Sequence, residues 1–331
     1  MVGVVHLSSQ ATLTRLVLVA AGTATVAVLL YSRRRLAGTT LLAPWWWSLA
    51  ALGSVLGTEL IIIATWGDSA ESQRWVEPTR YIAQVTMLCP AIALLGAKRP
   101  QDRAWQLIVL SLWAILALPA ATALLFPRAV FQISPVWSWF LLALIAIGVL
   151  NYLPTRFWPA CLVLGAAQTL LLWRHLPRPQ TAALRHADLA GFSRSGQIAL
   201  TLVLICTAIL LAQWIASRYR RKYFVAAAAR PFTESLDVLW LDFRDSFGAL
   251  WGLRVAERVN TVLARQDCKI ELRWSGWHCL PSNQNGSNSA PPTAIPPESA
   301  AVVATTATSI LRRFVSAEWI DSRICAQNTS S

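Results

Sequence analysis

Long runs of apolar residues, separated by short polar segments, fill the first two thirds of the chain. A helix that crosses a membrane needs roughly 20 apolar residues, because the hydrocarbon core is ~30 Å thick and each helical residue rises by 1.5 Å. The clearest run, 198–216, contains no charged residue and leads directly into the basic segment 218–222. We therefore expect about seven transmembrane helices, and the runs that predict them are 13–31, 41–66, 80–97, 105–126, 136–153, 157–173 and 197–217.

The pattern changes after residue 222, where a helical period replaces the continuous apolar runs. Apolar residues in 236–251 recur on one helical face, which predicts an amphipathic helix with an aromatic stripe. The stripe loses its register beyond Gly252, so we expect a kink or break near Gly248 and Gly252. The four aromatic members of the stripe are Trp240, Phe243, Phe247 and Trp251.

Three further segments follow this helix. Alternation in 269–274 predicts a short strand, and 298–325 carries the apolar residues of a last helix. Between them, Ser, Asn and Pro dominate and predict a disordered linker. The expected fold is an all-α polytopic membrane protein with a small C-terminal domain that is mainly helical or α+β. Its divisions are 1–222 for the transmembrane domain, 223–280 for the amphipathic helix and strand, 281–297 for the linker, and 298–331 for the last helix and tail.

Basic residues gather at the ends of the apolar runs and give a net charge of +13, from 29 Lys and Arg against 16 Asp and Glu. Positive residues beside a span resist translocation, so they mark the cytoplasmic side. The basic segments 33–35, 98–99 and 218–222 therefore place the N-terminus outside and the C-terminus in the cytoplasm. Because the basic excess is a topology signal, we expect the lipid bilayer and another membrane or cytoplasmic protein as partners, and no nucleic acid. Short loops and the lack of sorting signals favour a bacterial inner membrane over a eukaryotic one.

One segment conflicts with this simple topology. The loop 174–196 is basic, yet the alternation of seven spans places it outside. Either the larger basic excess in the other loops overrides the rule that basic loops stay in the cytoplasm, or a short run beside Arg156, such as 157–173, is not a true crossing.

Glu59 is the sharpest candidate for chemistry inside the bundle. It lies about seven residues, or ~10 Å, inside the outer end of its run, where an ionised carboxylate is costly and such residues line pathways or proton relays. Arg80 and Gln84 enter from the same side in the next run, and Gln168 reaches a similar depth. Two interpretations stay open: a polar site made of these four residues, or a structural strut in which Glu59 pairs with Arg80.

The aromatic stripe is the candidate interaction surface of the C-terminal domain. It either packs on the strand and the last helix as core, or lies on the bilayer surface beside the basic segment 218–222. Asp242, Arg244 and Asp245 fall on or near the polar side of the same helix, so we expect a solvated face there, not an acid–base pair.

Motifs that hold a metal, a nucleotide or an acyl group do not occur in the sequence. The six cysteines have no C-x-x-C spacing, and the four histidines are scattered. We therefore expect no cofactor and no metal, and we assign no catalytic residue.

Three classes of function remain. The favoured one is an integral membrane protein that anchors a cytoplasmic domain, which binds a partner or the membrane surface. The second is a transporter or channel that uses Glu59, and the least favoured is a membrane-embedded enzyme acting on lipid-linked substrates. Two segments, 151–160 and 236–260, stand out as distinctive without disclosing an activity.

Overall fold

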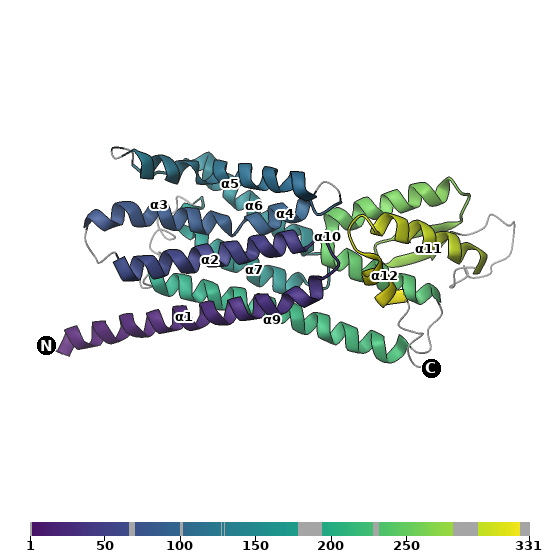
Figure 1. Cartoon of the computed structure of the whole chain (residues 1–331), viewed down its shortest axis with the longest axis horizontal. Coiled ribbons are helices and arrows are strands. Elements are labelled where there is room, and N and C mark those ends of the chain that lie inside the picture. Colours follow the sequence, from purple (N-terminus) through teal and green to yellow (C-terminus); the bar gives the residue numbers. More distant parts are fainter. Residues whose placement is uncertain are drawn as a thin grey trace.

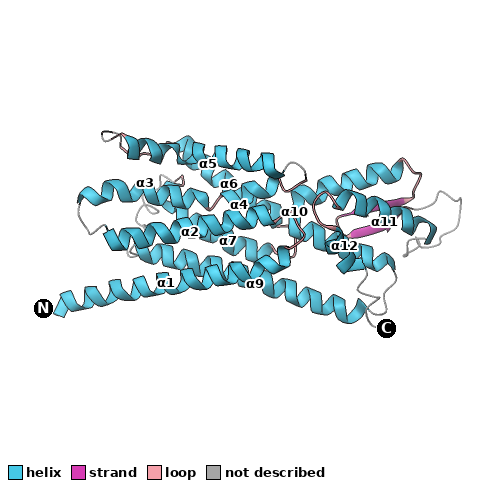
Figure 2. Cartoon of the chain, in the orientation of Figure 1, coloured by secondary structure: helices cyan, strands magenta, loops and turns pink. Residues whose placement is uncertain are grey.

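The computed structural model describes residues 2–65, 70–99, 102–126, 128, 130–177, 194–227, 232–280 and 297–324. Most of these residues lie in helices (Figure 2). Three expectations fall wholly or mostly outside the described residues: most of the basic loop 174–196, nearly all of the linker 281–297, and the tail after residue 324.

The first group of helices runs along the long axis of the molecule, and we call it the bundle (Figure 1). Within it, α1 packs along α9, α9 packs along α7, and α2 lies beside α3 and α4. The bundle elements are α1 (Val2–Leu36), α2 (Leu42–Thr65), α3 (Ala70–Thr86), α4 (Cys89–Leu95), α5 (Asp102–Leu125), α6 (Pro135–Tyr152), α7 (Trp158–Leu172), η1 (Trp173–His175) and α9 (Arg194–Ala227).

Five helices among the described residues are long and apolar enough to cross a membrane. Their apolar parts expose many large side chains, as expected of surfaces that face lipid. These helices support a membrane-embedded protein of the all-α class. The five segments are Leu13–Leu36, Leu42–Ala64, Ala104–Leu125, Pro135–Tyr152 and Arg194–Tyr219.

The two other expected runs take shorter forms. The run 80–97 is divided, because α3 ends at Thr86 and α4 starts at Cys89 with a proline in its first turn. Proline has no N–H to donate, so it suits a helix start and interrupts a longer helix. The run 157–173 contains the 15-residue helix α7, which continues into the 3-10 turn η1.

The remaining elements, which we call the C-terminal elements, lie at one end of the bundle (Figure 1). The expected strand at 269–274 is β1, and it pairs antiparallel with a second strand, β2, which the sequence pattern did not predict. The last helix expected over 298–325 is two helices. The C-terminal elements are α10 (Phe232–Ala264), β1 (Ile270–Arg273), β2 (Gly276–Cys279), α11 (Pro297–Leu311) and α12 (Ala317–Ile324).

The predicted break in the amphipathic helix is confirmed at Gly248. Its φ of 80° and ψ of −175° interrupt α10 between two helical halves. A positive φ is accessible to glycine because it has no Cβ, so the break falls where the sequence permits it.

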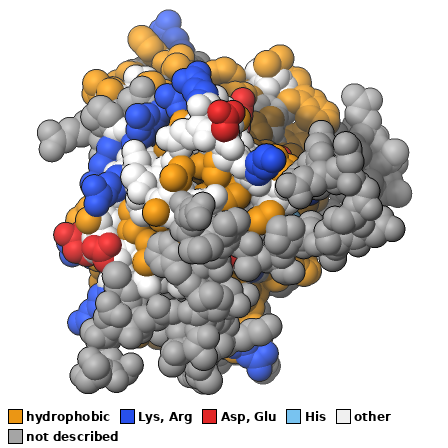
Figure 3. All heavy atoms as spheres, turned by 90° about the vertical axis from the view of Figure 1, so that its right-hand side faces the viewer, with side chains coloured by type: hydrophobic (Ala, Val, Ile, Leu, Met, Phe, Trp, Pro, Cys, Tyr) orange, Lys and Arg blue, Asp and Glu red, His pale blue; other side chains and the backbone are white. Residues whose placement is uncertain are grey.

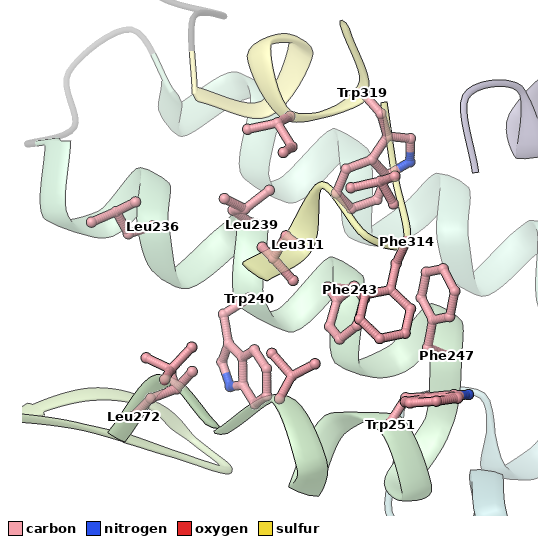
Figure 4. Packing of buried hydrophobic residues seen from close by; sticks show 14 of the residues in the cluster. Leu236, Leu239, Trp240, Phe243, Phe247, Trp251, Leu272, Leu311, Phe314 and Trp319 are labelled. Carbon is pink, nitrogen blue, oxygen red and sulfur yellow. The ribbon is translucent and has the colours of Figure 1, made fainter. Parts of the chain in front are cut away.

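The aromatic stripe lies in the core of the C-terminal elements, as the first of its two interpretations describes, and this corrects the expectation of an interaction surface. Figure 4 shows the rings grouped around Phe314, which stands edge-on to three of them. Phe243 and Phe247 stack with ring centroids 4.7 Å apart. The hairpin and α11 cover this face of α10, so its apolar area is buried within the chain. The buried members are Trp240, Phe243, Phe247 and Trp251.

A short segment after α11 joins the C-terminal elements to the bundle by backbone hydrogen bonds. The N–H of Thr40 donates to the carbonyl of Phe314 at 2.9 Å, and the N–H of Ser316 donates to the carbonyl of Gly38. The N–H of Arg99 donates to the carbonyl of Arg313 at 2.8 Å. The connections before α2 and after α4 are thus both held by the segment 313–316.

Candidate functional site

The end of α6 and the turn that joins it to α7 reach the break in α10, and the last two residues of α6 hold it from both sides. The hydroxyl of Tyr152 donates to the carbonyl of Ser246 at 3.0 Å, and the N–H of Leu250 donates to Oδ1 of Asn151 at 2.9 Å. A Cβ on Gly248 would lie 2.7 Å from Cγ and 2.9 Å from the backbone oxygen of Asn151. The glycine therefore allows both the turn of the chain and this close approach.

Arg156 follows in the same turn and forms ion pairs with two carboxylates of α10. Its Nη2 lies 2.7 Å from Oδ1 of Asp242, and its Nε lies 3.4 Å from Oδ2 of Asp245. The guanidinium also lies over the ring of Tyr219 on α9, 3.8 Å from the ring centroid. One arginine therefore contacts α9 and α10 while it belongs to the α6–α7 turn.

Two further arginines complete what we call the Arg156 network. Asp242 also accepts from Nε of Arg323 on α12 at 3.0 Å, and Asp245 accepts from Arg244 at 2.9 and 2.7 Å. Nη1 of Arg244 donates to the carbonyl of Trp274 at the tip of the hairpin. The network is made of Arg156, Asp242, Arg244, Asp245 and Arg323.

The expectation of a solvated face at Asp242 and Asp245 is wrong. Asp245 is 1% exposed and Asp242 is 9% exposed. The aromatic face of α10 is covered by the other C-terminal elements, and its polar face is covered by the α6–α7 turn. An amphipathic pattern predicts that the polar face of a helix is solvated. Because α10 is covered on both faces, the carboxylates on its polar face are buried.

The electrostatics of the network are those of a buried docking contact. Burial raises the pKa of Asp245 above its ordinary value, because it penalises the charged form, while Arg244 and Arg156 act in the opposite direction. Three guanidiniums face two carboxylates, and Nη1 of Arg156 has no hydrogen-bond partner among the described residues. The arrangement holds two parts of the chain together.

A second polar site lies at the opposite end of the bundle. Nε of Arg80 lies 2.6 Å from Oε1 of Glu59, and Nη2 lies 2.9 Å from Oε2. This two-bond geometry is the strongest form of an arginine–carboxylate contact. Glu59 is 1% exposed, so the structure places it as the buried, paired carboxylate that the strut interpretation describes.

A small hollow beside this pair has room for about one water molecule. Gln84 lines it, and its Oε1 is buried without a hydrogen-bond partner among the described residues. Gln168 does not line the hollow, and its Nε2 donates to the carbonyl of Met87 at the break between α3 and α4. The lining also holds charged and polar residues that the sequence analysis did not assign to the site: Glu77, Arg174, His175, Arg194 and Gln197.

The basic charge of the loop 174–196 is the sequence feature from which these additional lining residues could have been predicted. Arg194 forms an ion pair with Glu77, and Arg174 lies in η1 directly after α7. The basic loop thus supplies two arginines to the hollow.

Among the described residues, no group of three or more His, Cys, Asp and Glu is placed to hold a metal ion. The five cysteines that the structure describes are free thiols. A scan against protein-family models found no match, and searches of the curated proteins and of the solved structures found none either.

Proposed function

We propose that the protein is a membrane-anchored platform, whose bundle holds the C-terminal elements as a cytoplasmic domain in one fixed position for a partner protein. The observation that carries the proposal is the pairing of Arg156 in the bundle with Asp242 and Asp245 of α10. In this topology, α3 and α4 together form one of the two remaining crossings of a seven-span bundle, and α7 forms the other. The N-terminus lies outside.

Docking at separate places supports a fixed position. The Arg156 network holds the first half of α10, Asn151 holds the break at Gly248, and the segment 313–316 pairs with two connections of the bundle. In addition, Nε1 of Trp251 donates to the carbonyl of Leu94 at the end of α4. A domain that only needed tethering would not require contacts from this many elements.

Because the aromatic stripe is core, the surface for a partner must lie elsewhere on the C-terminal elements. The second half of α10 exposes Leu253, and it exposes Arg254 and Arg258 one turn apart. Residues four apart lie within about 40° of each other around a helix. Arg265 and Lys269, both exposed, follow the helix.

The charge of this surface indicates the chemistry of the partner. Neither Arg254 nor Arg258 forms an ion pair within the part of the chain that the structure describes, and Arg254 lies over the ring of Trp251. Figure 3 views the molecule from the end that carries the C-terminal elements and shows Lys and Arg side chains along one side, with a few Asp and Glu side chains beside them. A partner with an acidic face complements such a surface, and complementary charge favours fast and specific association.

The test uses a photo-crosslinking amino acid in place of Leu253 in the full chain, expressed in its native host. We expect a discrete crosslinked adduct that weakens when Arg254 and Arg258 are both changed to Glu. The matched control carries the crosslinker at Glu318, an exposed site on α12. An adduct that is equally strong at both positions, or unaffected by the charge reversal, would contradict the proposed surface.

A second candidate function, a transporter or channel built on Glu59, is favoured by the charged hollow beside the Glu59–Arg80 pair. It predicts that Glu59→Gln abolishes an ion flux in proteoliposomes while the protein still inserts. A normal flux in this variant would remove the candidate.

A further inference from the structure

Basic side chains from both parts of the chain occupy the end of the bundle that meets the C-terminal elements. Arg33 and Arg34 close the apolar part of α1, and Lys98 and Arg99 follow α4. The C-terminal elements add an arginine pair directly after α11. We call this set the basic belt, and its members are Arg33, Arg34, Lys98, Arg99, Arg312 and Arg313.

An exposed tryptophan, Trp46, marks the depth of the belt relative to the membrane. Indole rings favour the headgroup level, where the ring is buried and the N–H stays near water. The guanidinium of Arg33 lies 5.7 Å from the ring centroids of both Trp45 and Trp46, and Trp46 is 53% exposed. These rings lie near the start of one apolar segment, and Arg33 lies near the end of another. The belt is therefore level with the lipid headgroups.

Arg312 and Arg313 are set at this level by backbone geometry. The carbonyl of Arg313 accepts from the N–H of Arg99, and the next residue, Phe314, accepts from Thr40. Both arginines are exposed, and neither forms an ion pair within the described residues. The nearest acidic residue on α12, Glu318, interacts electrostatically with Arg99. The local balance of charge stays strongly positive.

We propose that the basic belt is a binding surface for the anionic headgroups of phospholipids, to which Arg312 and Arg313 contribute from the C-terminal elements. The lipid-binding proposal extends the proposed function. It rests on the proposed function in one respect: both place the C-terminal elements on the bundle at the membrane surface. Arginine suits the ligand, because its planar fork matches the oxygens of a phosphate. The headgroup depth of the belt favours lipid over a soluble anionic partner.

The experiment uses the full chain, purified in an uncharged detergent and mixed with equal amounts of phosphatidylglycerol and phosphatidylcholine that carry the same acyl chains. Native mass spectrometry then measures how much of each lipid the protein retains. We expect phosphatidylglycerol to be preferred, and the double variant Arg312→Gln/Arg313→Gln to lower its affinity by up to about 30-fold, at roughly fivefold per basic residue. Retention of phosphatidylcholine should not change.

Two further variants make the result decisive. Arg312→Lys/Arg313→Lys keeps the charge and should retain most of the preference. Arg254→Gln/Arg258→Gln removes the same charge from the exposed face of α10 and should leave lipid retention unchanged. Equal losses in this control and in the Arg312/Arg313 variant would overturn the proposal, as would retention of the two lipids in equal amounts. Neither outcome affects the crosslinking test at Leu253, so the two proposals fail separately.

Discussion

The guanidinium of Arg156, in the turn between α6 and α7, lies 2.7 Å from the carboxylate of Asp242 on α10. The two residues are 86 positions apart in the sequence. Both side chains are largely buried, so removal of either one would leave the other charge buried without this partner.

Changing Arg156 to Gln should loosen the C-terminal elements from the bundle. Removal of one partner from a buried ion pair costs about 3–5 kcal/mol, because the other charge stays buried and unpaired. Hydrogen–deuterium exchange of the detergent-solubilised full chain should show faster exchange in α10. The matched control is Arg273→Gln, which breaks the exposed pair with Glu271. An exposed pair contributes only about 0–1 kcal/mol, so exchange in α10 should hardly change.

Changing Gly248 to Ala should destabilise the break in α10. The positive φ disfavours any residue with a Cβ, and that Cβ would press on Asn151. We expect a loss of at least about 2 kcal/mol, measured as a lower apparent unfolding temperature in detergent. Gly57→Ala is the control, because no atom of a neighbouring element lies within 4 Å of the added Cβ, and a helical glycine replaced by alanine gains up to about 1 kcal/mol. Equal unfolding temperatures for the two variants would contradict the assigned role of Gly248.

The stability of the folded chain should depend on pH through the titration of Asp245. Its pKa is raised in the folded state by burial, so the folded state holds the proton more tightly than the unfolded state. Stability then falls as the pH rises from the ordinary aspartate value toward the raised pKa, and is constant above it. The measurement is the apparent unfolding temperature of the wild type minus that of Asp245→Asn across this range. A difference that grows with rising pH would show instead that the arginines dominate.

A double-mutant cycle at Glu59 and Arg80 should distinguish a strut from a functional charge. Each single change to Gln leaves one buried charge unpaired and should lower the apparent unfolding temperature. The double variant Glu59→Gln/Arg80→Gln removes both charges and should recover part of the loss. Additive losses in the double variant would show that the two side chains are not coupled.

Features with a local signal could be predicted from the sequence. The apolar runs predict the membrane-spanning helices, and five of them reappear as long apolar helices. The break at Gly248 was predictable because the aromatic stripe loses its register shortly after it, beyond Gly252. The division of the run 80–97 was not, because a proline near the start of α4 does not by itself distinguish a kink from a new helix.

The site depends on contacts that no local pattern encodes. Asp242 and Asp245 lie off the apolar stripe and resemble a solvated face, and only the arrival of Arg156 and Arg323 from distant segments buries them. Segments 151–160 and 236–260 stood out separately in the sequence, and the structure shows that they meet. At Glu59 the partner Arg80 could be named, because the antiparallel order of neighbouring spans brings the two to the same depth.

The position of Arg156 also sets an order of events during synthesis. Its turn emerges from the ribosome 86 residues before Asp242. At 5–20 residues per second, Asp242 is synthesised roughly 4 to 17 s after Arg156. Tyr219, whose ring lies under the guanidinium of Arg156, is also synthesised before Asp242. The bundle is thus a template that exists first, and the C-terminal elements complete their fold upon it.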